Sequence, residues 1–371
     1  MAKRKRIPGL HCAASADKMV RLVLRTQLKK MCHLRDLALD WSDPEGVHDM
    51  RVLSRRLRSA VSDFKPYLSK GTLPRLKLRA IARSLGAVRD EDVVLIALEG
   101  LKAKAKEGAA EGIEILEEER RLKQSEARSA LEKALEQTAV DDFRKDYLSK
   151  LRLIGVALPT RSSAQAANVE PAQFWQLGAG IIEGRLKEFT AASRFIYSPF
   201  EINQLHELRI LAKRLRYAIE LFATCWGDEM EEIAKEVAAM QTALGELHDC
   251  DVWIQSLSRR LRARSSASDE NHARLKEGAT WLLSHFSKRR TEYYRDALAR
   301  WQRWENDELL SRLKSILARD LSPAPPPPEL VSEPGVSPLP LERLGEGAKL
   351  SDRIKRRACL RVSTTCGSGR A

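Results

Sequence analysis

HDMRVLSRRLRSAV, residues 48–61, returns at residues 206–219 as HELRILAKRLRYAI, with identical or similar residues at most positions. A second block follows each copy at nearly the same spacing, as LGAVRDEDVV at 85–94 and LGELHDCDVW at 244–253. One short basic match would arise easily in a chain rich in Arg and Lys, but two ordered blocks would not. The repeat therefore predicts a core built from a duplicated unit of about 150 residues.

The sequence within and between the repeated blocks is typical of helices. Gly and Pro are sparse before residue 320, and apolar residues recur at i, i+3 and i+4 without the alternation of strands. Breaks near SDPEG and SKGTLP separate the first helices. We expect helices at 16–39, 47–67, 74–101 and 111–137, with another helical stretch after residue 140. The sequence thus predicts an all-α protein.

The chain divides by composition into four parts. The two repeats are expected at 10–156 and 171–320, joined by a linker at 157–170 with the sequence ALPTRSSAQAANVE. Beyond residue 321 the sequence SPAPPPPELVSEPGVSPLP has too much Pro for helices and too few large apolar residues for a core. We predict a disordered tail at 321–371 whose basic end is RIKRRACLRV.

Net charge indicates the class of binding partner, and cysteine content indicates the redox compartment. The 371 residues include 65 Lys and Arg against 51 Asp and Glu, a net charge of +14, which favours polyanions: nucleic acid, an anionic membrane surface or phosphate polymers. Six scattered cysteines without CxxC pairs indicate neither a zinc site nor a disulfide framework and favour a reducing cytoplasm. No secretory leader and no apolar run of membrane-spanning length is present, so a membrane span is not expected.

The repeated helix carries a stripe of positive charge. On a helix, residues i, i+3, i+7 and i+10 fall within about 80° of arc, opposite the apolar residues. The stripe is a row of cations about 4.5 to 6 Å apart along the axis, which suits a string of phosphates better than a single one. A solvated helix face is the alternative for any one copy. Both copies keep the same order of residues: His48, Arg51, Arg55 and Arg58, and His206, Arg209, Lys213 and Arg216.

Acidic and histidine residues of the second block have structural and catalytic interpretations. Asp90, Asp92, Asp249 and Asp251 are expected in ion pairs with Arg residues of adjacent helices. A metal site from His206 with the His248–Asp249 pair, as in HD-type phosphohydrolases, is disfavoured because the first repeat has Arg89 where the second has His248. No phosphate loop, HExxH motif or nucleophile elbow occurs, so we predict no metal, no cofactor and no catalysis.

Together the two blocks resemble the conserved histidine α-helical domain, or CHAD domain, family. Its repeats carry His-x-x-Arg-x-x-x-(Lys/Arg)-(Arg/Lys)-x-Arg followed by Leu-Gly-x-x-Arg-Asp-x-Asp-Val, and the resemblance covers about residues 10–320. His248 departs from the pattern by replacing its Arg. The resemblance implies two four-helix bundles related by a pseudo-twofold axis, with the basic helices facing a central groove that binds inorganic polyphosphate. It also implies a cytoplasmic protein associated with polyphosphate granules.

Carried over by position, the resemblance implies that the polyphosphate-binding residues are His48, Arg51, Arg55, Arg58, His206, Arg209, Lys213 and Arg216. Arg56 and Arg214 would add flanking charge, and the i, i+3, i+7 stripe of Lys18, Arg21 and Arg25 would extend the site. The triphosphate tunnel enzyme domain found beside some members has a Glu-x-Glu-x-Lys signature that is absent here, so a stand-alone binding protein is expected.

Two alternatives to polyphosphate remain open from the residues. Other polyanions, above all nucleic acid, would bind the same charge through counterion release, although the stripes lack interleaved aromatics and a helix-turn-helix signature. An enzyme acting on phosphoanhydrides would need carboxylates arranged to hold magnesium, which the sequence does not display.

Overall fold

A computed structural model describes residues 7–70, 72–157, 172–262 and 270–321. The described residues cluster as one compact unit. The predicted tail beyond Leu321 and the predicted linker beyond Ala157 lie outside the described residues. In the part of the chain that the structure describes, no helix is both long and apolar enough to cross a membrane.

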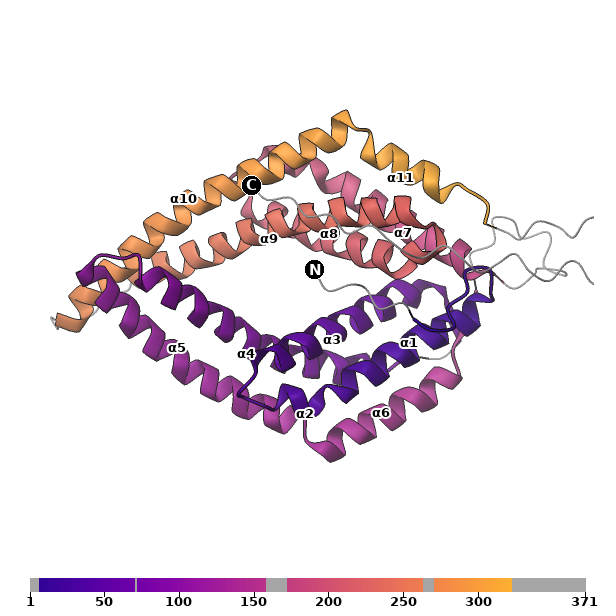
Figure 1. Cartoon of the computed structure of the whole chain (residues 1–371), viewed down its shortest axis with the longest axis horizontal. Coiled ribbons are helices and arrows are strands. Elements are labelled where there is room, and N and C mark those ends of the chain that lie inside the picture. Colours follow the sequence, from indigo (N-terminus) through magenta and orange to yellow (C-terminus); the bar gives the residue numbers. More distant parts are fainter. Residues whose placement is uncertain (1–6, 71, 158–171, 263–269, 322–371) are drawn as a thin grey trace, which may run out of the picture. The chain divides into compact units, whose positions relative to one another are not determined.

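Helices dominate the fold (Figure 1), which confirms the all-α prediction. The first half contains α1 (Ala16–His33), α2 (Arg35–Ala38), α3 (Pro44–Phe64), α4 (Arg75–Lys102), α5 (Glu107–Ala134) and α6 (Gln137–Arg152). The second half contains α7 (Phe174–Ala192), α8 (Ile202–Phe222), α9 (Asp228–Arg262), α10 (Glu270–Asn306) and α11 (Leu309–Leu317). Short 3-10 helices η1 (Lys65–Tyr67), η2 (Ser193–Tyr197) and η3 (Ala223–Cys225) follow α3, α7 and α8. Strands β1 (Leu68–Lys70) and β2 (Gly155–Val156) pair antiparallel.

The two halves repeat the same order of elements. Helices α3 and α8 carry the first repeated block, contain 21 residues each and begin at Pro44 and Ile202. Helices α4 and α9 carry the second block, and each forms a hairpin with the next long helix, α5 or α10. Helices α1 and α7 complete a four-helix set in each half, and α6 and α11 add a fifth helix. The duplicated architecture expected from the sequence is therefore confirmed.

One hydrophobic core runs through both halves. The rings of Phe64 at the end of α3 and Phe222 at the end of α8 meet edge to face, with centroids 6.2 Å apart. The ring centroid of Phe174 of α7 lies 4.7 Å from that of Phe222, and all three side chains are fully buried. Burying each such ring stabilises the fold by about 1.5 to 3 kcal/mol. Because this core spans the repeat boundary, it fixes α3 and α8 next to each other.

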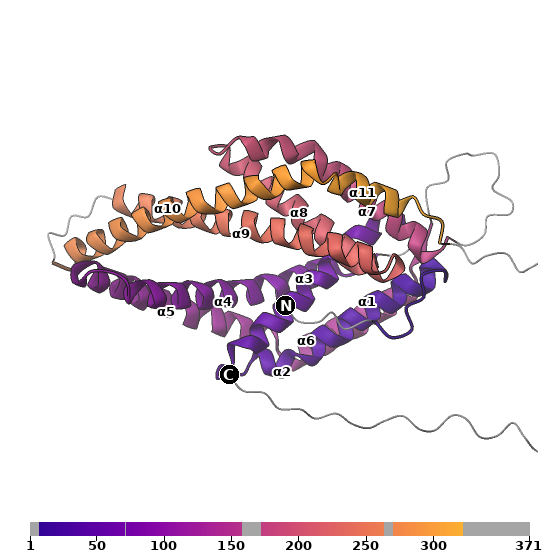
Figure 2. The same ribbon diagram turned by 45° about the horizontal axis from the view of Figure 1, so that its top comes forward.

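The far ends of the two helical hairpins meet in a second, smaller core (Figure 2). Leu98 and Ile113 come from the α4–α5 hairpin, and Leu257 and Leu282 come from the α9–α10 hairpin. Helices α5 and α10 touch through their backbones here, because a Cβ added to Gly112 would lie 2.0 Å from the carbonyl oxygen of Arg274. The halves are therefore joined at both ends of the long helices.

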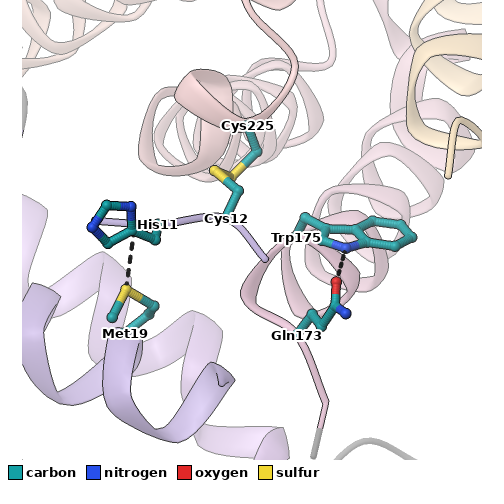
Figure 3. Close-up of a disulfide and its surroundings, with 6 residues drawn as sticks. All are labelled: His11, Cys12, Met19, Gln173, Trp175 and Cys225. Atoms are coloured by element: carbon teal, nitrogen blue, oxygen red, sulfur yellow. Dashed lines mark hydrogen bonds between the residues drawn. A yellow bond between two sulfur atoms is a disulfide. The ribbon is translucent and has the colours of Figure 1, made fainter. Parts of the chain in front are cut away.

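A disulfide bond joins Cys12 to Cys225 of η3 (Figure 3), which corrects the expectation from the scattered cysteines. The segment around Cys12 also pairs with the chain leading into α7: the amide of Phe174 donates to the carbonyl of Ala14 at 2.9 Å, and that of Trp175 to the carbonyl of Cys12 at 3.0 Å. The bonded cysteines are 213 residues apart, so their spacing gave no signal. The bond ties the beginning of the chain to the second half.

Candidate anion-binding site

Helices α3 and α8 turn their apolar faces to the core and their basic faces to the space between the halves. The carboxylate of Asp43 caps α3 by accepting from the amide of Glu45 at 2.9 Å, and Pro44 occupies the first turn, where its missing N–H costs nothing. The apolar stripes are buried as expected, for example Met50 and Leu57 on α3 and Leu215 on α8. This packing orients the positive stripes.

A cavity of about 350 Å³ lies where α3 and α8 meet the start of α4. Of its described lining residues, six carry positive charge: Arg55, Arg58, Arg75, Arg79, Lys213 and Arg214. The acidic lining residue Asp63 is buried and held by Arg185 of α7 at 2.7 Å, so its charge is already compensated. The cavity is thus a concentration of cations from both repeats.

Electrostatics show that these cations crowd one another. Burial and the charges of Arg209, Arg55, Arg58 and Arg214 lower the pKa of Lys213 to about 8. Partial burial and the charge of Arg79 lower the pKa of Arg58. Like charges in a partly desolvated space disfavour the charged form, and an anion between them would reverse this.

Two guanidinium groups also have unused donors. The Nε atoms of Arg55 on α3 and Arg209 on α8 are buried and have no hydrogen-bond partner among the described residues. A buried donor without a partner costs about 1 to 3 kcal/mol. A phosphate oxygen would satisfy such donors with charge-assisted hydrogen bonds.

The second repeated block continues the site with mixed charges. Arg51 of α3 bonds to Asp90 of α4 at 2.8 Å. Asp249 of α9 interacts electrostatically with Arg209 of its own half and with Arg51 and Asp90 of the other. Farther along α9, Asp251 pairs with Arg290 of α10 at 2.5 Å, as expected for a structural ion pair.

The fourth carboxylate of this group, Asp92, is buried and accepts from Gln124 of α5 at 2.7 Å, a hydrogen bond in place of the expected ion pair. The carboxylates therefore hold the arginine-bearing helices together at the end of the cation cluster.

Several predicted binding residues lie outside the cavity. Arg216 donates to Glu220 at 2.7 Å and to Gln241 at 2.5 Å, and Arg56 lies 3.8 Å from Glu220 beside a separate cavity of about 90 Å³. These two arginines are therefore partly neutralised within the protein.

The predicted extension on α1 lines another pocket, against α6. Lys18, Arg21 and Arg25 share this pocket with Arg152. The guanidinium of Arg21 donates twice to the carbonyl of Ile154, at 2.7 and 3.2 Å. The structure does not join this stripe to the cavity between α3 and α8.

The two predicted histidines have different surroundings. His48 is half-buried in the first turns of α3, where its ring lies with the exposed carboxylates of Glu45 and Asp49, all with possible ligand atoms within 4.8 Å. Exposed acidic groups beside a histidine are common without an ion, so these three residues carry no metal prediction. His206 instead packs against His248 of α9, with ring centroids 4.0 Å apart.

Comparison with models of known protein families assigns this chain to a family. A family model described as the CHAD domain matches residues 22–258, which is more than half of the chain. The chain belongs to the CHAD domain family. The resemblance noted in the sequence is thereby confirmed. No match was found among curated protein sequences.

Two solved structures are similar in fold. The crystal structure of the CHAD domain from the plant Ricinus communis has 21% sequence identity and a TM-score of 0.58, over 86% of this chain and 97% of that one. PptA from Streptomyces chartreusis has 15% identity and a TM-score of 0.56, over 78% of this chain and 100% of that one. At such identities the likeness concerns the fold alone.

Sequence reasoning missed part of the charge in this CHAD domain. Arg75 and Arg79 stand four apart at the start of α4 and line the cavity, but the second repeat has Ala234 and Ala238 at the corresponding positions. The repeat therefore gave no signal for these two arginines. Their i, i+4 spacing directly after Pro74 was the available signal. Arg214, expected only as flanking charge, lines the cavity as well.

Proposed function

We propose that this CHAD domain protein binds inorganic polyphosphate without catalysis, through the cation cluster between α3, α4 and α8. The observation that carries the proposal is the cavity of about 350 Å³ whose described lining holds six cations from both repeats, with Lys213 among arginines of α3, α4 and α8. A long chain of phosphates offers closely spaced charges to such a cluster, and forked arginine donors match phosphate oxygens. The family resemblance supports the same ligand.

The shape of the cluster favours a chain over a single phosphate. Cations follow α3 from Arg51 through Arg55 to Arg58 and continue onto α4 at Arg79, while Arg209, Lys213 and Arg214 supply the second helix. The row on α3 alone extends over seven steps along the helix, or about 10 Å, which exceeds the reach of one phosphate. Association with polyphosphate granules is the cellular role that we propose for this affinity.

A four-site variant tests the proposed function. Replacing the cluster residues with Gln should lower the affinity for long-chain polyphosphate more than a hundredfold, since two lost charge-assisted bonds of about 1.5 kcal/mol each already reach that factor. The residues are Arg51, Arg55, Arg209 and Lys213. Affinity is measured by isothermal titration calorimetry at several salt concentrations, and circular dichroism checks that the helices persist.

A charge-matched control separates a shaped site from net charge. It replaces four exposed lysines of other helices with Gln: Lys123, Lys133, Lys145 and Lys187. The control should keep most of the affinity at near-physiological salt. Equal losses in the two variants, or equal and steeply salt-dependent binding of single-stranded DNA and polyphosphate, would contradict a dedicated polyphosphate site.

A further inference from the structure

Two histidines pack together in the second half: His206, which the family resemblance counts among the binding residues, and His248, which has no assigned role. His206 of α8 and His248 of α9 stack with ring centroids 4.0 Å apart and a 33° tilt between the rings. Both are half-buried, and the Nδ1 atoms of both are buried without a hydrogen-bond partner among the described residues. A second proton on either ring would place an N–H group at such an atom, so the free protein favours neutral rings.

The positive charges around the pair also disfavour protonation of the rings. Burial and the charges of His206, Arg209 and Lys213 lower the pKa of His248 to about 4. Burial and the same two cations also lower the pKa of His206, against a smaller opposing effect of Glu207. Of these two cations, Lys213 lines the cavity between α3 and α8, and Arg209 lies one turn before it on α8. A ligand that neutralises them would therefore remove much of the barrier to protonation.

The elements packed around α8 and α9 contribute both signs of charge. Helix α7 packs on the apolar side of α8, where Gly178 faces Phe222, and α11 meets α9 near Glu236, about three turns from His248. The charged groups that act on the pair are Glu207, Arg209 and Lys213 on α8. Asp249, next to His248 on α9, interacts with Glu246 of its own helix, Arg51 on α3 and Asp90 on α4, while Arg290 on α10 pairs with Asp251. Arg290 is held by Asp251 and Arg51 by Asp90, and Arg209 interacts with Asp249, which leaves Lys213, surrounded by arginines, as the least compensated cation acting on the pair.

Comparison of the repeats shows what is particular about His248. The first half has Arg89 at the corresponding position, which adds permanent positive charge next to Arg51. The second half has a group that is neutral in the free protein and can become positive. The site thus has one end with fixed charge and one end whose charge can change.

We propose that the His206–His248 pair is a proton-coupled part of the polyphosphate site, taking up about one proton when the phosphate chain binds. The inference rests on the proposed function. One proton is expected because two stacked imidazolium rings would repel each other, so the pair titrates as a unit. Binding should then strengthen as the pH falls toward 5, and level off near pH 4, where the free pair is protonated already.

Calorimetry as a function of pH tests the inference. The affinity of the full chain for long-chain polyphosphate is measured at pH 5.5, 6.0 and 6.5, in two buffers with different ionisation enthalpies that report proton uptake directly. One coupled proton changes the affinity up to about tenfold per pH unit. Lys213 stays outside this window because its pKa of about 8 keeps it protonated throughout. Long chains make the titration of terminal phosphates negligible.

Three variants assign the proton. His248→Arg installs the residue type of the first repeat and should bind with little dependence on pH. The double variant His206→Gln and His248→Gln should lose both the slope and the proton uptake. His285→Gln is the matched control, since burial and nearby cations also lower the pKa of His285 but it lies on α10 with Trp281 and outside the cavity. It should keep the slope of the unmodified protein.

The outcomes separate the inference from the proposed function. Polyphosphate binding with no proton uptake, or the same pH slope in the His248→Arg and double-Gln variants as in the unmodified protein, would overturn the role of the histidine pair alone. Absence of polyphosphate binding at every pH would overturn the proposed function, and the inference with it.

Discussion

At the scale of single residues, Lys213 shows how the fold keeps positive charge available for a ligand. Its ammonium group is largely desolvated and surrounded by guanidinium groups, so its pKa falls from 10.5 to about 8. At pH 7 the group is charged in both the folded and the unfolded chain, and the repulsion exists only in the folded one. Lys213 therefore opposes folding in the absence of an anion.

Replacing Lys213 with Met should stabilise the protein and weaken polyphosphate binding. A shift of this size corresponds to at most about 3 kcal/mol, so we expect the free energy of unfolding at pH 7 to rise by about 1 to 3 kcal/mol. In the unmodified protein this free energy should also rise between pH 8 and 10.5, because only the unfolded chain holds the proton there. This contribution should be absent from the stability curve of the variant, so it should appear in the difference between the two curves.

Urea denaturation from pH 7 to 10.5 measures the stability of the unmodified protein and of Lys213→Met, and titration calorimetry measures their affinity for polyphosphate. Lys187→Met provides the control, because Lys187 is exposed on α7 and away from the cavity. The control should leave stability and polyphosphate affinity nearly unchanged. A loss of stability in Lys213→Met would show that the ammonium group is compensated within the protein, against the crowding described here.

At the scale of helices, the sequence predicted the elements well because the repeat and the helical periodicity pointed the same way. Helix α3 was expected at 47–67 and runs from Pro44 to Phe64, and α5 was expected at 111–137 and runs from Glu107 to Ala134. The short antiparallel pairing of β1 with β2 was missed, since strands of three and two residues are too short for an alternating pattern.

The site was predictable only as far as helix faces determine it. The spacing placed Arg55 and Lys213 on the basic stripes of their helices, and both line the cavity. The i, i+4 pairing of Arg216 with Glu220 was also within reach of helical periodicity, but its hydrogen bond to Gln241 of α9 was not. Contacts between segments far apart in sequence were also invisible, as with the packing of His206 on His248 and the capture of Arg21 by the carbonyl of Ile154. Helical periodicity gives the direction of a side chain and not its partner.

The close approach of α5 and α10 gives a prediction about how the hairpins meet. Gly112→Ala should destabilise the protein, because the new Cβ would lie 2.0 Å from the backbone oxygen of Arg274 and the helices would have to separate. Overpacking of this kind typically costs about 1 to 3 kcal/mol. Thermal denaturation followed by circular dichroism measures the effect.

Gly184→Ala on α7 is the matched control for the hairpin contact. A Cβ at Gly184 meets nothing within 4 Å, so the better helix propensity of Ala should raise stability by up to about 1 kcal/mol. If both substitutions stabilise the protein, α5 and α10 do not touch through their backbones as described.

At the scale of the whole molecule, the repeats act as one folding unit. The main core crosses the repeat boundary through Phe64 and Phe222, and the second core closes the far ends of the hairpins. Joining the halves at both ends holds the positive stripes of α3 and α8 near each other despite their repulsion. The Cys12–Cys225 bond adds a covalent link to the same arrangement. Disulfides persist in oxidising surroundings, so this bond weighs against the reducing cytoplasm that the cysteine pattern favoured.

Reduction of the Cys12–Cys225 bond should lower stability while leaving the binding site intact. The bond closes a loop of 213 residues, for which the chain-entropy model gives up to about 5 kcal/mol. Neither cysteine lines the cavity between α3 and α8, so polyphosphate affinity should change little. Urea denaturation of the oxidised protein, the reduced protein and a double variant with Cys12→Ser and Cys225→Ser measures the loss. Cys32→Ser, at a free half-buried thiol, is the control. Equal midpoints for the oxidised and reduced protein would mean that the noncovalent cores alone hold the two halves together.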